Sequence, residues 1–212
     1  MNHTGSHDEI LTAILDVLRS PPEDRIPIGI SNRHIHLSQG DLESLFGTGH
    51  TLTKTKDLSQ PGQYACKETV TICGPKGAIE KVRVLGPVRG KTQVEILASD
   101  CFRLGVDAPI KSSGDLTDTP GDVTLVGAKG SVRLQEGLII AQRHIHMTCE
   151  DAKGLGVQDG ELVSIAVYGT RGGVLYDTLI RANDDSTLEC HLDMEEANAL
   201  GADASTTIEI KK

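Results

Sequence analysis

The chain has very few aromatic residues: its 212 residues include no tryptophan, three tyrosines and two phenylalanines. Proteins that bind single-stranded nucleic acids stack bases on aromatic side chains, so this composition argues against such a surface. The chain also lacks an excess of positive charge, because its formal net charge is -9. An acidic chain is repelled by a phosphate backbone, and we therefore expect no nucleic-acid partner.

Long hydrophobic runs and a cysteine framework are absent as well. No apolar run reaches the roughly 18 residues of a membrane-spanning helix, so we expect no membrane association. The five cysteines are odd in number and irregularly spaced, which is not the framework of a small secreted protein. Since no signal peptide is recognisable, the sequence predicts a cytoplasmic protein.

A histidine motif occurs twice in the chain. Residues 32–38 read NRHIHLS, and residues 142–148 read QRHIHMT. Side chains alternate between the two faces of a strand, so each His-Ile-His places both imidazoles on one face. Two imidazoles on one face can bind a metal ion, although a single such pair is more often an exposed or an internally hydrogen-bonded pair.

The repeat extends beyond this motif. Residues 104–108 (LGVDA) correspond to residues 200–204 (LGADA) at an offset of 96 positions, whereas the histidine pairs are 110 positions apart. The first copy therefore carries about 14 extra residues, which we place in the polar run 51–63. With the offset of 96, Glu95 falls opposite His191. Each copy thus offers three candidate metal ligands, which are His34, His36 and Glu95 in the first copy and His144, His146 and His191 in the second.

These six residues predict zinc rather than a harder metal. Calcium and magnesium prefer oxygen ligands, whereas nitrogen-rich sites with one carboxylate suit Zn²⁺. Three protein ligands leave a fourth position for water or substrate, which is typical of catalytic zinc. An alternative interpretation keeps Glu95 out of the metal sphere and gives it the task of orienting His34 or His36.

The spacing of apolar residues and turn signals predicts a mainly β fold with short helices, built as two similar small β-barrels from the internal duplication. We expect a strand over residues 28–37, hairpins over residues 70–79 and 123–132, and short helices that follow Ser38, Ser99, Thr148 and Asp193. Residues 8–19 carry apolar side chains at helical spacing, and Pro21 and Pro22 end that helix. This helix packs on its own domain or docks on a groove of another protein.

Positive charges near the predicted sites are the last group of candidates. Arg89 lies in a turn just before the strand of Glu95, and a guanidinium can bind phosphate through two hydrogen bonds. Read from the residues alone, Arg89 is better explained as a solvated arginine of a turn. Lys76 and Arg83 are expected to be surface charges unless a polyanion docks on the first copy.

Several of these segments together resemble the phosphate propanoyltransferase family, the phosphotransacylases of the propanediol-utilisation type found with bacterial microcompartments. The resemblance covers roughly residues 25–210. The segments that carry it are residues 26–38 (IPIGISNRHIHLS), 74–77 (GPKG), 85–89 (LGPVR), 94–95 (VE) and 143–146 (RHIH).

The resemblance implies two barrels with a chain crossing between them. Its lobes would be residues 34–141 and residues 25–33 plus 142–212, preceded by residues 1–24 as a helix and linker. It also implies two zinc ions in a shared cleft, held by the same six ligands. Arg89 matches the phosphate-binding arginine of the family, and its coenzyme A contacts fall on Ser31, Lys76, Arg83 and Asn198.

The predicted function is the transfer of an acyl group, propanoyl or acetyl, between coenzyme A and inorganic phosphate by direct displacement. The family's N-terminal helices often act as encapsulation signals, so residues 8–19 are expected to bind shell or cargo proteins inside a microcompartment. A homo-oligomer is compatible with the sequence. Two alternatives are a zinc-dependent hydrolase of thioesters or amides, and a non-enzymatic zinc-binding scaffold module.

Overall fold

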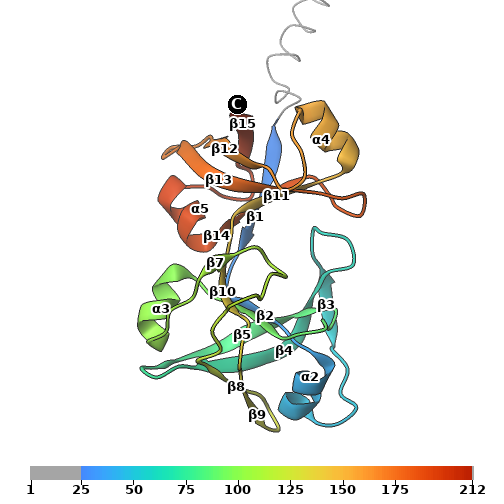
Figure 1. Ribbon diagram of the computed structural model, residues 1–212, viewed down its shortest axis with the longest axis vertical. Coiled ribbons are helices and arrows are strands. Elements are labelled where there is room, and N and C mark those ends of the chain that lie inside the picture. Colours follow the sequence, from blue (N-terminus) through green and yellow to red (C-terminus); the bar gives the residue numbers. More distant parts are fainter. Residues whose placement is uncertain (1–24, 212) are drawn as a thin grey trace, which may run out of the picture.

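In the computed structural model, which describes residues 25–211, the strands form two separate sheets (Figure 1). One sheet closes into a six-stranded barrel, and the other forms a nine-stranded half-barrel. The expected mainly β fold with two barrel-like units is therefore confirmed. We call the half-barrel with its helices the first lobe and the closed barrel with its helices the second lobe.

The barrel of the second lobe has the strand order β1 (Ile26–Ser31), β14 (Glu189–Asp193), β11 (His144–Met147), β13 (Gly173–Ala182), β12 (Leu162–Val167) and β15 (Thr207–Lys211). The order in the first lobe is β7 (Ile110–Lys111), β10 (Leu138–Ala141), β6 (Gln93–Glu95), β2 (His34–His36), β5 (Ala78–Gly86), β4 (Tyr64–Cys73), β8 (Thr124–Val126) and β9 (Ser131–Arg133), with β3 (Lys54–Asp57) paired to β4. The helices of the described residues are α2 (Gln39–Phe46), α3 (Ala98–Leu104), α4 (Cys149–Leu155) and α5 (Met194–Leu200).

The chain crosses between the lobes just before the first histidine motif. β1 runs parallel to β14 in the barrel, whereas β2 lies between β5 and β6 in the other sheet. The single strand expected over residues 28–37 is therefore wrong, because Asn32 and Arg33 interrupt it. As a result, β1 leads directly from one lobe into the metal-ligand strand of the other.

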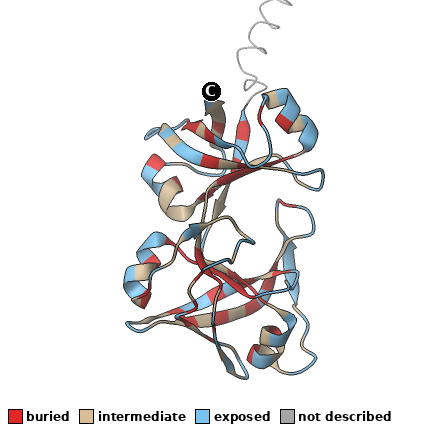
Figure 2. Cartoon of the chain, in the orientation of Figure 1, coloured by how far each residue is buried: buried red, intermediate tan, exposed pale blue. Residues whose placement is uncertain are grey.

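Each lobe has its own hydrophobic core. In the first lobe, inward residues of β4 and β5 such as Ile72 and Val84 pack against the apolar face of α2. In the second lobe, Ile145, Ile165 and Ile208 are fully buried in the barrel. Figure 2 shows buried residues along the strands of both lobes and exposed residues on the outer faces of the helices. Alternation along the strands sends one face to the core and leaves the other for the site.

The expected hairpins and helices are present with one change. The hairpins form from β4 and β5 and from β8 and β9. Ser38 caps α2 by accepting a hydrogen bond from the Asp41 amide at 3.2 Å, and Thr148 caps α4 in the same way. The helix α3 begins at Ala98, so Ser99 does not cap it. Its first turn is held by the Asp100 carboxylate, which accepts from the Leu97 amide at 3.0 Å.

The helix predicted over residues 8–19 lies outside the described residues. Among the residues that the structure describes, no helix has the length and apolar character needed to cross a membrane.

The arginine directly before each His-Ile-His forms an equivalent ion pair in the two lobes. Arg33 Nε donates to Asp100 Oδ2 at 2.6 Å, and Arg143 Nε donates to Glu196 Oε1 at 2.6 Å. Both acids lie in the first turn of the helix that follows the third ligand of that lobe. Each ion pair therefore ties the motif strand to the end of the strand that carries its third ligand.

Replacing Arg33 with alanine is expected to lower the free energy of unfolding by about 2–4 kcal/mol, because it leaves a buried carboxylate without its charged partner. The Asp100 side chain is only 4% exposed. Urea denaturation of the full chain measures the change. The control is Lys91→Ala, which removes an exposed ion pair with Glu136 and should cost at most about 1 kcal/mol. Equal losses in the two variants would contradict this assignment.

Candidate active site

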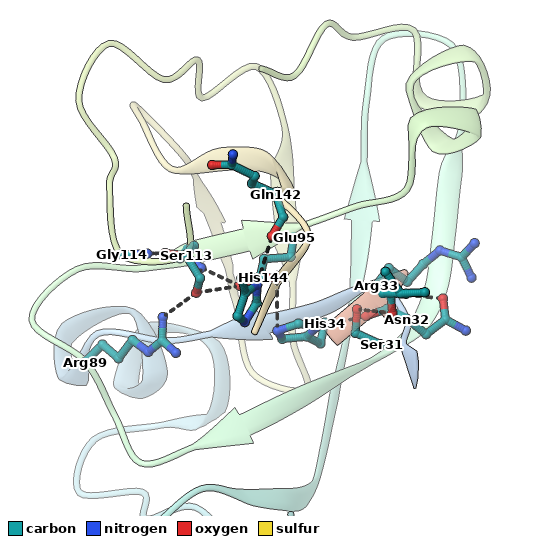
Figure 3. A network of polar contacts seen from close by, with 12 residues as sticks. Ser31, Asn32, Arg33, His34, Arg89, Glu95, Ser113, Gly114, Gln142 and His144 are labelled. Carbon is teal, nitrogen blue, oxygen red and sulfur yellow. Dashed lines mark hydrogen bonds and ion pairs between the residues drawn. The ribbon is translucent and has the colours of Figure 1, made fainter. Parts of the chain in front are cut away.

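The first candidate triad is assembled by two antiparallel strands of the first lobe. His34 on β2 lies directly opposite Glu95 on β6, and His36 follows two positions later on the same face of β2. Their ligand atoms all lie within 4.8 Å of one another. Figure 3 shows His34 and Glu95 facing each other, with His34 Nε2 3.4 Å from Glu95 Oε2. The structure thus brings together the three residues that the sequence predicted for this site.

Burial, hydrogen bonds and nearby charges shift the pKa values of His34 and His36 in opposite directions. His34 Nδ1 lies 2.8 Å from the Asn32 carbonyl oxygen, so Nδ1 carries the proton and Nε2 faces Glu95. Burial alone would lower the pKa of His34, but the charge and hydrogen bond of Glu95 outweigh it and raise the pKa. Burial lowers the pKa of His36 to about 3, and repulsion from His34 adds to the shift. His36 is therefore a neutral imidazole at neutral pH.

The second candidate triad repeats this arrangement in the barrel. His144 on β11 lies opposite His191 on β14, and His146 follows on the same face. The three ligand atoms again lie within 4.8 Å of one another, and the ring centroids are 4.7 to 5.0 Å apart. The Gln142 carbonyl lies 2.8 Å from His144 Nδ1, as Asn32 does for His34. The offset of 96 positions thus matches Glu95 with His191 in space.

The chemistry of the second triad fits a cation. His144 Nε2 and His146 Nε2 lie 3.1 Å apart. This distance is compatible with two neutral ring nitrogens that bind the same metal ion. Burial, with repulsion from the neighbouring imidazoles, lowers the pKa of His144 to about 4 and that of His146 to about 3. Both rings are therefore neutral ligands at neutral pH. Nδ1 of His146 and Nδ1 of His36 are buried without a hydrogen-bond partner in the described structure.

The two triads face one cavity between the lobes. It has a volume of about 570 Å³, and all six candidate ligands line it. Residues of β1, β5, β13 and the loop that connects β3 to β4 complete its wall. A cavity of this size can hold the acyl and thiol end of a cofactor together with a small anion.

Arg89 reaches this cavity from the segment between β5 and β6. Its backbone amide donates to the Leu37 carbonyl at 2.9 Å, which anchors it beside the histidine motif. Its guanidinium donates to Ser113 Oγ at 3.4 Å, and Ser113 in turn donates to Glu95 at 2.9 Å (Figure 3). Burial lowers the pKa of Arg89, Glu95 opposes the shift, and Arg181 adds to it. Among the described residues the guanidinium makes this one side-chain hydrogen bond, to Ser113, so its other N–H groups are available to an anion.

Three further residues of the site were missed in the sequence. Gln93 donates to Glu95 at 2.5 Å and to Ser113 at 2.8 Å, which holds the carboxylate in place. Arg181 on β13 lies opposite His146 in the pairing of β13 with β11, and it lines the same cavity. Gln93 precedes Glu95 by two positions, and this spacing on one strand face was a usable signal. Ser113 and Arg181 gave none, because only the tertiary fold brings their segments to the cavity.

The four residues matched to coenzyme A contacts fall in different places. Ser31 and Arg83 line the cavity. Lys76 lies exposed in the turn between β4 and β5, and Asn198 lies exposed on α5; neither lines the cavity. The structure therefore brings two of the four to the site.

Comparison with known proteins adds to this geometry. A family model described as phosphate propanoyltransferase matches residues 27–203. The chain is 54% identical over 187 residues to a phosphate propanoyltransferase of Thermotoga maritima, with 88% of each chain covered. It is 48% identical over 207 residues to one of Clostridioides difficile, with 97% of this chain and 99% of the relative covered. A relative of the same name from Salmonella typhimurium is 49% identical over 191 residues, with 90% of this chain and 89% of the relative covered. The chain therefore belongs to the phosphate propanoyltransferase family and is a transferase.

Proposed function

We propose that the protein exchanges an acyl group between coenzyme A and inorganic phosphate at a two-zinc site, with propanoyl as the main acyl group and acetyl as a second. The observation that carries the proposal is that two triads of metal-ligand type face one cavity beside the guanidinium of Arg89. Arg89 would anchor phosphate beside the two triads, and zinc ions held by the triads would supply Lewis acidity there.

The donor sets suit zinc in both lobes. His34, His36 and Glu95 would hold one ion, and the three histidines of the second lobe would hold the other. When bound, zinc supplies Lewis acidity that polarises carbonyl and phosphoryl oxygens and stabilises a thiolate.

The chain's own residues orient the phosphate. Arg89 can bind two phosphate oxygens side by side, and Ser113 next to it limits how the guanidinium turns. Arg181 adds a second positive charge from the other lobe, where it lines the same cavity. None of the ion pairs among the described residues involves Arg181. A dianion between the two guanidinium groups is therefore favoured over water.

The reaction proposed is a direct displacement. A phosphate oxygen forms a bond to the carbonyl carbon of the thioester, the carbon–sulfur bond breaks, and coenzyme A leaves with that electron pair as a thiolate. Holding both reactants in one cavity supplies much of the rate by proximity. None of the five cysteines lines the cavity. Cys190, next to His191, is fully buried in the barrel core, and burial raises the pKa of its thiol. The cavity therefore offers no cysteine thiolate as a nucleophile.

Incubation of propanoyl-CoA with the protein is expected to release free thiol only when phosphate is present. Thiol is measured with a chromogenic reagent, and acyl phosphate by its conversion to a hydroxamate. Chelation should abolish both signals, and added Zn²⁺ should restore them, because the neutral imidazoles cannot replace the ion. Thiol release at the same rate without phosphate would favour a hydrolase and overturn the proposal.

Four further statements about the protein are proposals from the sequence. The lobes are divided as residues 34–141 and residues 25–33 plus 142–212, with coenzyme A bound near Ser31 and Arg83. Residues 8–19 bind shell or cargo proteins of a microcompartment. A homo-oligomer also stays a prediction.

A further inference from the structure

The third ligand of each triad has a polar partner two positions earlier on the same strand. On β6, Gln93 donates to Glu95 Oε1 at 2.5 Å. On β14, Glu189 Oε2 lies 2.5 Å from His191 Nε2. The two partners occupy equivalent places, because Gln93 lies opposite His36 and Glu189 lies opposite His146. Both members of the pair differ between the two copies. In the first copy the Gln93 amide donates to the Glu95 carboxylate, and in the second the Glu189 carboxylate accepts from the His191 imidazole.

The contact with Glu189 decides which nitrogen of His191 is free. An ionised carboxylate only accepts hydrogen bonds, so Nε2 of His191 must carry the proton. Glu189 Oε2 lies within hydrogen-bond distance of His191 Nε2 and also accepts from the Ser59 hydroxyl, and a glutamate carboxylate is ordinarily ionised at neutral pH. In a neutral ring with its proton on Nε2, the lone pair available to a metal lies on Nδ1.

The first lobe supplies the support for Glu189. The loop between β3 and β4 lies in the segment 51–63, where the repeat offsets place the extra residues of the first copy, and it contacts the barrel at the start of β14. Ser59 donates its hydroxyl to Glu189 Oε2. Gln60, which is only 4% exposed, donates to the Thr187 carbonyl at 3.0 Å and accepts from the Thr187 amide at 3.2 Å.

The strand on the other side of this pair leaves little freedom. Gly29 on β1 lies beside His191 in the barrel. A Cβ atom at Gly29 would lie 2.8 Å from Glu189 Cδ and 2.9 Å from His191 Cδ2. The imidazole and the carboxylate are thus confined between the backbone of β1 and the loop from the first lobe.

We propose that Glu189, held by Ser59 of the opposite lobe, is a positioning residue that fixes the ring of His191 with Nδ1 toward the second metal site. This rests on the proposed function, because it assigns the second triad to a metal ion. Carboxylates that hold a metal-binding imidazole in this way typically change metal affinity by about 10- to 100-fold when they are removed. The loop between β3 and β4 of the first lobe would then support the third ligand of the second lobe through Glu189.

The tautomer of His191 can be measured without metal. Long-range ¹H–¹⁵N correlation spectra of the metal-free, full-length protein, with the His191 signal assigned by its loss in His191→Gln, should show the proton on Nε2. Glu189→Ala should abolish that preference, whereas Glu80→Ala, which removes an exposed carboxylate of β5, should leave it unchanged. A proton on Nδ1 of His191 in the unchanged protein would overturn the proposal.

Zinc affinity supplies the second measurement. In competition with a chromophoric chelator, Glu189→Ala is expected to weaken one of two bound zinc ions by about 10- to 100-fold and to leave the other unchanged. Glu189→Gln should recover most of this loss, because its amide oxygen still accepts from Nε2. Ser59→Ala, which leaves Glu189 in place, should weaken the same ion by less than Glu189→Ala does.

Two results would overturn the role of Glu189. Unchanged affinity for both ions in Glu189→Ala would show that the carboxylate does not support the site. A loss in Glu189→Gln as large as in Glu189→Ala would show that the carboxylate binds the ion itself. These failures differ from failure of the proposed function, in which the unchanged protein binds no zinc or releases no thiol with phosphate.

Discussion

Replacing His146 with alanine is expected to reduce the zinc content from two ions to one per chain and to lower the rate of acyl phosphate formation by about 10³-fold or more. His146 is buried, it lies 3.1 Å from His144 through Nε2, and its pKa is lowered to about 3. No neighbouring side chain in this triad can take its place as a neutral nitrogen donor. Zinc is measured by mass spectrometry of the metal, and activity by the phosphate-dependent thiol assay.

The control for this variant is a histidine outside both triads. His50 stacks on Phe46 and lies 3.0 Å from Glu68 through Nε2, away from the cavity. In His50→Gln the amide can still donate to Glu68, so two zinc ions and full activity are expected. If His146→Ala kept both ions and the full rate, the second triad would not be a metal site.

Replacing Arg89 with alanine is expected to lower kcat/KM for phosphate by about 10²- to 10³-fold while the KM for propanoyl-CoA changes little. The guanidinium is partly buried beside Glu95 and Ser113, where its attraction to a dianion is screened less than at the surface. Arg89→Lys should show an intermediate loss, because it keeps the charge but not the two parallel hydrogen bonds. Initial rates with phosphate and propanoyl-CoA varied separately measure these effects.

A charge-matched control separates this role from a general effect of net charge. Arg133 is an exposed arginine on β9 that does not line the cavity, so Arg133→Ala should leave both KM values unchanged. An Arg89→Ala enzyme whose KM for propanoyl-CoA rises while that for phosphate stays constant would show that Arg89 binds coenzyme A instead.

The duplication explains why so much of the candidate site could be predicted. A repeated His-Ile-His on strands places two imidazoles on one face in each copy, and the offset of 96 positions aligns Glu95 with His191 as the third candidate ligand of each copy. The structure places His34 opposite Glu95 and His144 opposite His191. The repeat alignment finds equivalent ligands because two copies of one fold keep equivalent strand positions even when a loop of one copy is longer.

Other parts of the site could not be predicted because they depend on contacts between the lobes. Ser59 contacts Glu189 across 130 positions of sequence, and Gln60 contacts Thr187 across 127. Neither contact leaves a local pattern, since a loop residue carries no periodicity. The sequence predicted the polar run 51–63 only as an insertion. In the structure, two of its residues form hydrogen bonds with the opposite lobe. Lys76 shows the reverse case, because its motif resembles the family but its exposed turn does not line the cavity, and its contact with coenzyme A stays a prediction.

By itself, the sequence determined that the protein is a duplicated, mainly β chain with two equivalent sets of nitrogen and oxygen donors. Strand periodicity and the repeat offsets carry this information locally, so it is readable without coordinates. Only the tertiary structure decided that β1 crosses into the other lobe, that Arg89 and Arg181 face one cavity, and that Ser59 reaches Glu189. These facts depend on how two independently packed cores meet, and the side chains at that junction are selected by shape and charge across space rather than by spacing along the chain.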